Sequence, residues 1–559
     1  MTTGKLLRGG IQLLSLTLFL GLLWQTVSPL PETFFPVDFF LRLDPLSAVA
    51  VPVTERTFIA SLLPGLLIMA LAFCGGRFFC GWICPMGTTM DGIRAILRRT
   101  GKKRNTKNLS QAFFSFSVRK AIKIKYLLLL TVLIAAIWGV NLVFWCSPMT
   151  LITRFYTLLV HPVILDLNKY FLDWGRPAWE YFQFSSLLYA QISPRSYDTV
   201  FFIFFLFLLL MALEYKIPRF WCRFLCPSGA LLSLASFRPL WRRRVRACHH
   251  CGNCSAVCPM ESIAADEAVT NTRECIACQR CAGVCPAKGI TFSFPGRTSE
   301  DKQDNKYPSF LPSRRSFLLA GGAGMACTAL HMPGNYFSSW LSQESDSSRV
   351  SSCIRPPGSI PETDFLARCL RCGACMKVCP TNGLQPVWFS AGISGMFSPA
   401  LIPRRGACDP NCNACGHVCP TQAITKLPLA EKQAAKIGTA VVHEDYCIAW
   451  KDGKRCVVCQ ELCPYGAVIL TQEGRNVPVP EIAAARCFGC GYCEQHCPVQ
   501  PPAITIKPQN ALRIHTAQYK IAAAKAGLSL TLQDKNDETW LPDTHSFKEG
   551  DLPPGFTAE

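Results

Sequence analysis

The sequence predicts an α-helical membrane domain of four spans, followed by two cysteine-rich α+β domains. Three observations indicate this fold class. Half of the 559 residues are apolar, and many of them fall into four long stretches before the first cysteine-rich region. These stretches and the segments after them repeat as a two-helix unit. Twenty-four of the 32 cysteines form six groups of four, each ending in Cys-Pro.

The four apolar stretches have the composition of membrane-spanning helices. They are Ile11–Val27, Phe58–Gly75, Tyr126–Trp145 and Val200–Leu213. A span needs about 20 apolar residues; the first three approach this length, and the fourth is shorter and aromatic. A buried soluble helix could explain the fourth stretch alone but not the set of four. We therefore expect a membrane domain over residues 1–240, in contact with lipid.

The loops between the stretches differ in charge. Residues 94–125 hold eleven Lys or Arg and no acid, and residues 214–247 hold eight against one acid. Residues 28–56 and 147–199 each hold four acids, against two and four basic residues. Because basic loops stay inside, the basic loops and the N-terminus should be cytoplasmic in a multi-pass protein of the bacterial inner membrane. This bias explains the net charge of +20 without nucleic acid as a partner.

The duplicated unit carries a C-x3-C-P motif in each copy. Asp44-Pro45 follows the first stretch and Ser147-Pro148 the third, while the second and fourth are followed by related segments that begin Arg-Phe. Parallel repeats predict a pseudo-twofold axis along the membrane normal. That axis would bring four thiolates together at the cytoplasmic ends of spans two and four. They could hold a seventh cluster, or they could be reduced thiols that cap helix ends. These cysteines are Cys80, Cys84, Cys222 and Cys226.

Residues 241–295 contain two groups spaced C-x2-C-x2-C-x3-C-P, which is typical of bacterial two-cluster ferredoxins. In that pattern the fourth cysteine ligates the other [4Fe–4S] cluster. Disulfide scaffolds do not repeat this spacing and zinc ribbons use isolated pairs, so iron–sulfur is favoured. The sequence predicts a ferredoxin-like domain on the cytoplasmic side. Its two expected sites are Cys248, Cys251, Cys254 with Cys285, and Cys275, Cys278, Cys281 with Cys258.

Residues 346–510 contain four more groups and predict a four-cluster domain, giving six [4Fe–4S] clusters in the chain. The first gap widens to three residues in group two and to eight in group three. Strand-like runs follow three of the groups, at 423–425, 467–470 and 503–506. We expect exchange of the fourth cysteine between groups one and four and between groups two and three; pairing of neighbours is the alternative. No C-x-x-C-H occurs, so covalent haem is not expected. In order, the groups are Cys369, Cys372, Cys375, Cys379; Cys408, Cys412, Cys415, Cys419; Cys447, Cys456, Cys459, Cys463; and Cys487, Cys490, Cys493, Cys497.

The segment 296–345 joins the two cysteine-rich domains. It begins as a polar linker and continues with Ser313-Arg314-Arg315-Ser316-Phe317, which has the form of a twin-arginine export signal. The apolar run after it ends near Leu330 and could be a cleaved signal or a fifth membrane anchor; a plain helix and a chance Arg pair are the alternatives. Export would place the second domain in the periplasm. Residues 511–559 are expected to be a tail.

Two known families resemble the two halves. Residues 1–295 resemble the NapH/MauN membrane ferredoxin-type proteins in their spans, doubled C-x3-C-P motif and two cluster groups. Residues 313–510 resemble the NapG/MauM ferredoxin-type proteins, through the twin arginine, the four groups, and Arg355-Pro356-Pro357-Gly358 before Asp364–Cys369. A fusion of the two implies a quinol dehydrogenase module. It would pass electrons from the quinone pool to a periplasmic reductase or cytochrome, such as a nitrate reductase system.

Other features leave the function open. Doubled C-x3-C-P proteins also resemble assembly factors, which implies an alternative role in reducing a metal or thiol for a respiratory enzyme. His161 and His331 lie near expected membrane boundaries and could accept protons from quinol, although a lone histidine is more often structural. No catalytic residue is identified. The remaining cysteines are expected to be small buried hydrophobes; they are Cys74, Cys146, Cys327 and Cys353.

Overall fold

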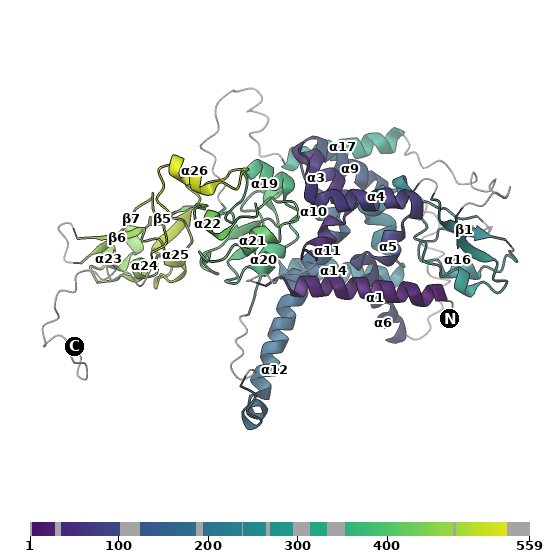
Figure 1. The fold of residues 1–559 in the computed structure, drawn as a ribbon, viewed down its shortest axis with the longest axis horizontal. Coiled ribbons are helices and arrows are strands. Elements are labelled where there is room, and N and C mark those ends of the chain that lie inside the picture. The colour runs from purple at the N-terminus through teal and green to yellow at the C-terminus, as the bar shows by residue number, and fades with distance from the viewer. Residues whose placement is uncertain are drawn as a thin grey trace.

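A helical domain lies in the middle of the molecule, with one cysteine-rich domain at each end of its long axis (Figure 1). The N-terminus lies toward the first cysteine-rich domain, and the second occupies the opposite end. The computed structural model describes residues 3–27, 35–100, 123–185, 194–236, 239–246, 248–263, 269–294, 314–331, 353–472 and 477–533.

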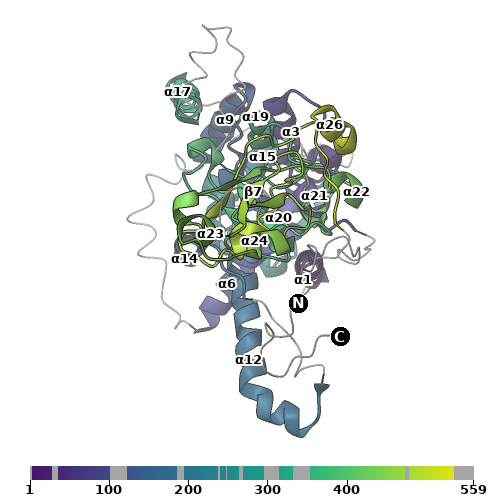
Figure 2. The ribbon, with the colours of Figure 1, turned by 90° about the vertical axis from the view of Figure 1, so that its left-hand side faces the viewer.

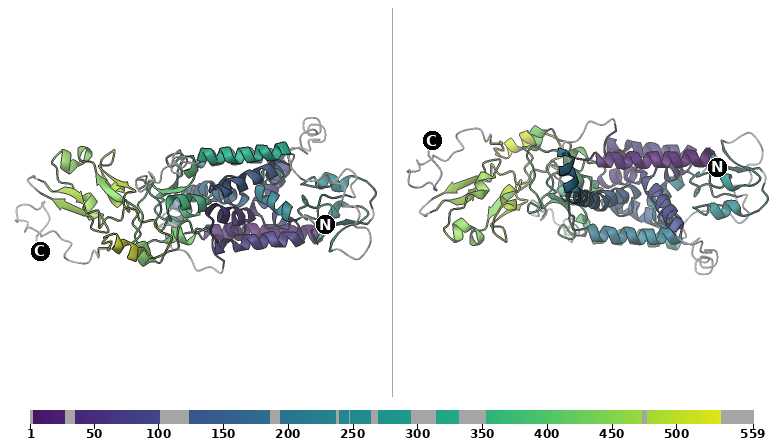
Figure 3. Two further views of the ribbon diagram at one scale, coloured as in Figure 1. Left: turned by 90° about the horizontal axis from the view of Figure 1, so that it is seen from above. Right: turned by 90° about the horizontal axis from the view of Figure 1, so that it is seen from below.

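Helices form at all four predicted stretches. They are α1 (Thr3–Trp24), α4 (Leu63–Gly75), α9 (Ile124–Ile137) and α14 (Val200–Lys216). Helices α1 and α17 (Arg314–His331) run along the long axis on opposite sides of the helical domain, as Figure 1 and the left view of Figure 3 show. At Gly324 an added Cβ would lie 3.0 Å from Ile134 Cγ2, so the small residue lets α17 pack closely on α9.

Among the described helices, fewer than four are both long enough and apolar enough to span a membrane. Within the described stretches, two helices satisfy both criteria, at Leu6–Trp24 and Pro148–Pro177. A third would be the pair Ala60–Gly75 and Phe78–Ile96, which is bent by 97°. Helices α9 and α14 have 14 and 17 residues, shorter than the roughly 20 of a typical span. The helix at 148–177 falls where the sequence predicted a loop.

That unexpected helix consists of three segments. Helix α11 (Pro148–Phe155) continues through the π-helical turn η2 (Tyr156–Val160) into α12 (His161–Tyr181). Helix α12 projects sideways from the molecule, at a steep angle to α1 (Figures 1 and 2). Its exposed side chains include Tyr170 and Trp174, aromatic residues of the kind found at membrane interfaces.

The duplicated motifs begin two short helices that meet inside the helical domain. Asp44 caps α3 (Pro45–Glu55) and Ser147 caps α11, each with proline at the first helical position. Ser147 Oγ donates to Asp44 Oδ2 at 2.7 Å, and Ser228 Oγ donates to the other carboxylate oxygen. The remaining short helices of the two repeats are α2 (Phe39–Arg42), η1 (Ala60–Leu62), α5 (Phe78–Trp82), α6 (Pro85–Thr100), α10 (Val143–Cys146), η3 (Trp221–Leu225) and α15 (Pro227–Ala235).

The first cysteine-rich domain is closed by its outer strands. Strand β1 (Arg242–Val245) pairs antiparallel with β2 (Ile290–Ser293), with Arg242 opposite Ser293. Both cysteine groups lie between these strands in sequence. Two short helices connect them, α16 (Asn253–Val257) and η4 (Ala282–Val284).

The second cysteine-rich domain repeats this arrangement. Strand β5 (Thr439–Val442) pairs with β8 (Ile504–Lys507), and β6 (Val468–Thr471) pairs with β7 (Val479–Ile482). The expected strands at 467–470 and 503–506 form, whereas Ile424 forms only an isolated bridge with Ser359. Strands β3 (Leu384–Pro386) and β4 (Pro399–Leu401) form a further pair. The helices are α19 (Glu362–Arg368), α20 (Ala374–Val378), η6 (Ile393–Gly395), α21 (Ala414–His417), α22 (Leu429–Lys432), η7 (Glu444–Tyr446), α23 (Ile448–Lys451), α24 (Val458–Glu461) and α25 (Tyr492–Gln495).

The fold continues past the expected boundary at residue 510. Helix α26 (Tyr519–Lys525) packs back on the second domain, and Tyr519 is fully buried in a cluster with Leu427 and Ala435. Arg513 Nη1 donates to Glu362 Oε2 at 2.7 Å. Residues 511–533, which were expected to be tail, are therefore part of the described fold. The polar linker, Ser313 of the twin-arginine motif and the side chain of His331 lie outside the described residues.

Candidate iron–sulfur centres

The first domain brings its eight cysteines together around two cavities. Cys285 lies with the first three cysteines of group one, and Cys258 lies with those of group two. Arg243 lines both cavities, and its Nη2 donates to Cys254 Sγ at 3.6 Å. This is the crossed arrangement that the ferredoxin spacing predicts. The two sets are Cys248, Cys251, Cys254, Cys285 and Cys258, Cys275, Cys278, Cys281.

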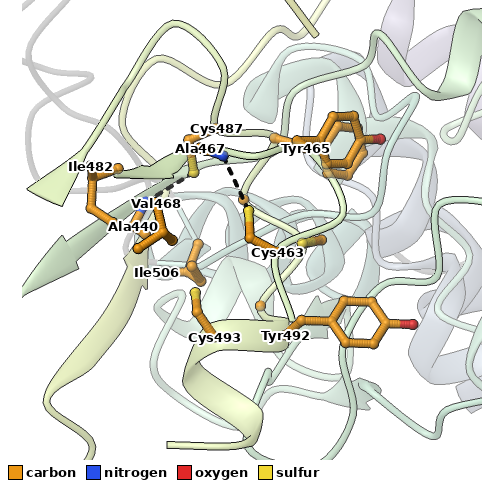
Figure 4. Close-up of a pocket in the computed structure, with 14 residues that line it drawn as sticks. Ala440, Cys463, Tyr465, Ala467, Val468, Ile482, Cys487, Tyr492, Cys493 and Ile506 are labelled. Carbon is orange, nitrogen blue, oxygen red and sulfur yellow. Dashed lines mark hydrogen bonds between the residues drawn. The ribbon is translucent and has the colours of Figure 1, made fainter. Parts of the chain in front are cut away.

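Groups three and four of the second domain exchange their fourth cysteines. One cavity is lined by Cys463 with the first three cysteines of group four, and its walls are apolar (Figure 4). The backbone N–H groups of Ala467 and Ala440 donate to Cys463 Sγ and Cys487 Sγ, at 3.3 and 3.4 Å. Hydrogen bonds to sulfur of this kind tune cluster potentials. A neighbouring cavity is lined by Cys447, Cys456, Cys459 and Cys497.

Groups one and two exchange in the same way. Burial raises the pKa of Cys375 most, and the nearby Cys372, Cys369 and Cys419 raise it further, with the smallest contribution from Cys415. Burial likewise raises the pKa of Cys415, with added contributions from Cys408, Cys412 and Cys379. The structure thus places Cys419 with Cys369, Cys372 and Cys375, and Cys379 with Cys408, Cys412 and Cys415.

The expected pairing of group one with four and of two with three is therefore wrong. The reason lies in the strands that close each two-group unit. Strand β5 precedes group three and β8 follows group four, just as β1 and β2 enclose the two groups of the first domain. The Ser359–Ile424 bridge encloses groups one and two. Pairing of the outer segments holds successive groups together.

The four sites of the second domain follow one another away from the helices. Cys408 N donates to Cys490 O at 2.8 Å, which joins the site of group two to that of group four. Cys493 lines both the group-four and the group-three cavities. Helices α20 and α21 lie beside the helical domain, and α23 lies at the far end (Figure 1). From the helices outward, the four sites thus follow in the order group one, group two, group four and group three. Each site takes the name of the group that supplies its first three cysteines.

The group-one site docks on the helical domain. Arg154 donates from Nε and Nη2 to Arg371 O, at 3.1 and 2.9 Å. Asn141 Nδ2 donates to Ala367 O at 2.7 Å, and Thr157 Oγ1 donates to Cys372 O at 3.4 Å. Backbone carbonyls of the cysteine loop thus bind side chains of α11 and its surroundings.

Gly373 is required at this contact. Its φ is +85°, and an added Cβ would lie 2.8 Å from Thr157 Oγ1. We expect Gly373→Ala to destabilise the docked second domain by about 1–3 kcal/mol, since a strained backbone and a clash coincide. Gly453→Ala is the matched control, because its φ is +60° but nothing lies within 4 Å of the added Cβ. Thermal unfolding of both variants checks this; equal melting temperatures would mean that the contact contributes nothing.

The first domain docks through a buried carboxylate. Glu274, beside Cys275, accepts from Arg77 Nη1 at 2.6 Å, from Lys125 Nζ at 2.5 Å and from Tyr126 OH at 2.8 Å. Burial acts to raise the pKa of Glu274, but Lys125 and Arg77 outweigh burial and hold it below its ordinary value.

The C-x3-C-P motif lies directly under that domain. An added Cβ at Gly81, between Cys80 and Cys84, would lie 2.4 Å from Ile276 O, between Cys275 and Cys278. Only glycine permits this approach. The doubled motif and the Cys275 site therefore adjoin across the domain boundary.

The four cysteines of the doubled motif converge. Cys226 lies within electrostatic range of the other three thiols, and all four are buried. Arg219 Nη1 donates to Cys80 O at 2.7 Å and Arg77 Nη2 donates to Cys222 O at 3.3 Å, so each repeat supplies an arginine to the other. The arginines are recognisable in sequence only as equivalent positions of the repeat.

The four lone cysteines and His161 differ in how far they are buried. Among the four lone cysteines, Cys353 is buried as expected and Cys74 is exposed, which contradicts the expectation for it. Cys146 and Cys327 are partly buried and close enough to interact electrostatically. His161 is buried against Trp24, with ring centroids 5.8 Å apart.

Four of the cavities are each lined by a set of four cysteines around a central space, the arrangement in which a cubane cluster is held. Models described as a 4Fe-4S binding domain match residues 57–104, 197–246 and 365–385, and models described as a 4Fe-4S dicluster domain match 240–303 and 407–467. The first two matches coincide with the duplicated unit.

Fold, cavities and matches define a protein with several 4Fe–4S ferredoxin-type domains that carries several iron–sulfur clusters. The chain belongs to the family of ferredoxin-type proteins that includes MauM and NapG. It is 33% identical over 207 residues to the methylamine utilization ferredoxin-type protein MauM of Methylorubrum extorquens, covering 35% of this chain and 90% of that protein. It is 33% identical over 166 residues to the ferredoxin-type protein NapG of Escherichia coli, covering 28% of this chain and 70% of that protein. No solved structure matches the chain.

Proposed function

We propose that this chain is a membrane-bound electron conduit that takes electrons from quinol and passes them to a periplasmic redox partner. The observation that carries the proposal is the outward series of four cysteine sites, which begins where the second domain docks on the helices. Bound [4Fe–4S] clusters would supply one-electron carriers at these sites. The acceptor in this proposal is a periplasmic nitrate reductase system, as the resemblance of the second half to the NapG/MauM proteins implies.

The proposal includes the finer assignments. The helical domain is of the NapH/MauN type and crosses the inner membrane with four spans; the first domain is cytoplasmic, and the twin-arginine segment directs the second domain to the periplasm. Six clusters occupy the 24 grouped cysteines, and a seventh occupies Cys80, Cys84, Cys222 and Cys226. In support, the cysteine-rich domains lie at opposite ends of the helical domain (Figure 1). The doubled motif is buried, and an arginine of each repeat binds the motif of the other.

The alternative is an assembly factor that reduces a metal or thiol of another enzyme. Burial of the doubled motif beneath the first domain leaves its thiols inaccessible to a large substrate. A series of four sites also exceeds what such a role requires. The conduit is therefore the better-supported function.

Quinol oxidation tests the conduit directly. We expect that anaerobically purified full-length protein mixed with reduced menaquinone and ubiquinone analogues becomes reduced within seconds, seen as new paramagnetic resonance signals. Dithionite serves as the control for cluster integrity. Protein that dithionite reduces but no quinol reduces would refute quinol as the donor.

A further inference from the structure

A cavity lies where α1, α2 and α11 meet the second domain. Its walls are mostly apolar, and the room inside it is about that of one water molecule, so a larger ligand requires the walls to move apart. The lining side chains come from both domains. They are Phe19, Leu23, Thr26, Val37, Asp38, Phe40, Leu41, Thr153, Ala374 and Val418.

Two polar groups in this wall lack partners. Asp38 Oδ1 and Thr153 Oγ1 are buried and form no hydrogen bond with the described residues, and both side chains are 2% exposed. Unsatisfied buried polar atoms are costly and uncommon in folded proteins, so two in one cavity need an explanation.

The orientation of Asp38 is unusual for its position. An aspartate at a helix N-cap normally accepts from the backbone N–H groups of the first turn. Asp38 precedes α2 but makes no such bond; its Oδ2 accepts from Arg42 Nε at 2.8 Å. Arg42 and Lys426 are the charged groups that face Asp38, and Lys377 Nζ donates to Thr26 Oγ1 at the wall of the same cavity. Its second oxygen is thus left for a ligand.

The cavity also adjoins one candidate cluster site. Ala374 and Val418 line the wall, and they immediately precede Cys375 and Cys419 of the group-one site. Two aromatic rings of the walls, Phe19 and Phe40, pack edge-to-face with their centroids 5.4 Å apart. Rings of this kind can separate to admit a flat aromatic headgroup, and an apolar cavity with a few polar groups is typical of small-molecule sites.

We propose that this cavity binds the headgroup of a quinol, with Asp38 accepting a hydroxyl proton and Thr153 hydrogen-bonding a ring oxygen. The inference rests on the proposed function and locates its donor site. One quinol becomes quinone as it releases two electrons, one at a time, toward the group-one site and the periplasmic acceptor. It also releases two protons, each of which passes to the Asp38 carboxylate and then to water. The site lies on the periplasmic side of the proposed membrane domain.

Three variants test the site in the full-length protein. Asp38→Asn should slow reduction by a quinol analogue on the order of a hundredfold, as for loss of a general base. Thr153→Val should slow reduction about tenfold, the effect of one lost hydrogen bond. Leu41→Trp should fill the cavity and abolish labelling of its walls by a photoreactive azidoquinone, a readout independent of electron transfer. Asp173→Asn is the matched control, because Asp173 is exposed on α12 away from the cavity.

The outcomes separate this inference from the proposed function. Reduction by dithionite and unchanged iron content show that each variant is folded. If quinol reduces the wild type, but all three variants react at the wild-type rate or the label maps elsewhere, the cavity is a water site and the inference is overturned while the conduit stands. If no quinol reduces or labels the wild type, the conduit and the inference both fail.

Discussion

The double variant Cys369→Ser with Cys419→Ser is expected to lose about four irons per molecule, one cubane's content. Both cysteines belong to one site in the structure, so removing the second costs nothing beyond the first. Cys369→Ser with Cys379→Ser should lose about eight irons, since these residues belong to different sites. Iron and acid-labile sulfide of anaerobically purified protein give the answer.

The same pair of variants distinguishes the possible pairings. If each group kept its own fourth cysteine, the two iron losses would be reversed. The pairing of group one with group four makes a third pattern, because Cys497 would then share a site with Cys369. In that case Cys369→Ser with Cys497→Ser would lose about four irons, whereas the structure predicts about eight.

Glu274→Gln is expected to release the first cysteine-rich domain from the helices at a cost of about 3–5 kcal/mol, because two buried cations lose their countercharge. Arg77 and Lys125 are both fully buried at this carboxylate. Glu261→Gln is the matched control in the same domain. Its carboxylate pairs with Arg223 but is 53% exposed, so its loss should cost at most about 1 kcal/mol. Unfolding in urea, monitored by protease cleavage between the domains, measures how far each variant weakens the contact.

The stability that Glu274 gives to this contact should depend on pH in a defined direction. The folded pKa of Glu274 is held below its ordinary value, so its stabilising contribution is complete above the unfolded pKa of about 4.3. That contribution is lost as pH falls through the folded pKa. The contribution of the Glu274 carboxylate itself should therefore not vary between pH 6 and 8. Equal urea midpoints for the wild type and Glu274→Gln at pH 7 would contradict the assigned role.

The sequence predicted the sites best where cluster ligation fixes the spacing of the cysteines. The crossing of Cys258 and Cys285 follows from a regular motif, and the structure places them accordingly. The pairing in the second domain could not be predicted, because it depends on long-range contacts such as that of β5 with β8, which are separated by two whole cysteine groups. The helix at 148–177 was missed because its charges made it resemble a loop. Asp38 and Thr153 carry no sequence signal, since only tertiary packing leaves their oxygens without partners.

Each arginine of the doubled motif serves the opposite repeat, through Arg77 to Cys222 O and Arg219 to Cys80 O. An ancestral chain with a single two-helix unit would have made both contacts by pairing with an identical copy, as an isologous homodimer does. Duplication within one gene would then join the two copies without requiring a new interface. After fusion the two halves were free to diverge, and only the second repeat carries Ser228 after its cysteine, where the first has Met86. The two reciprocal arginine contacts are the part of that interface that the present chain retains.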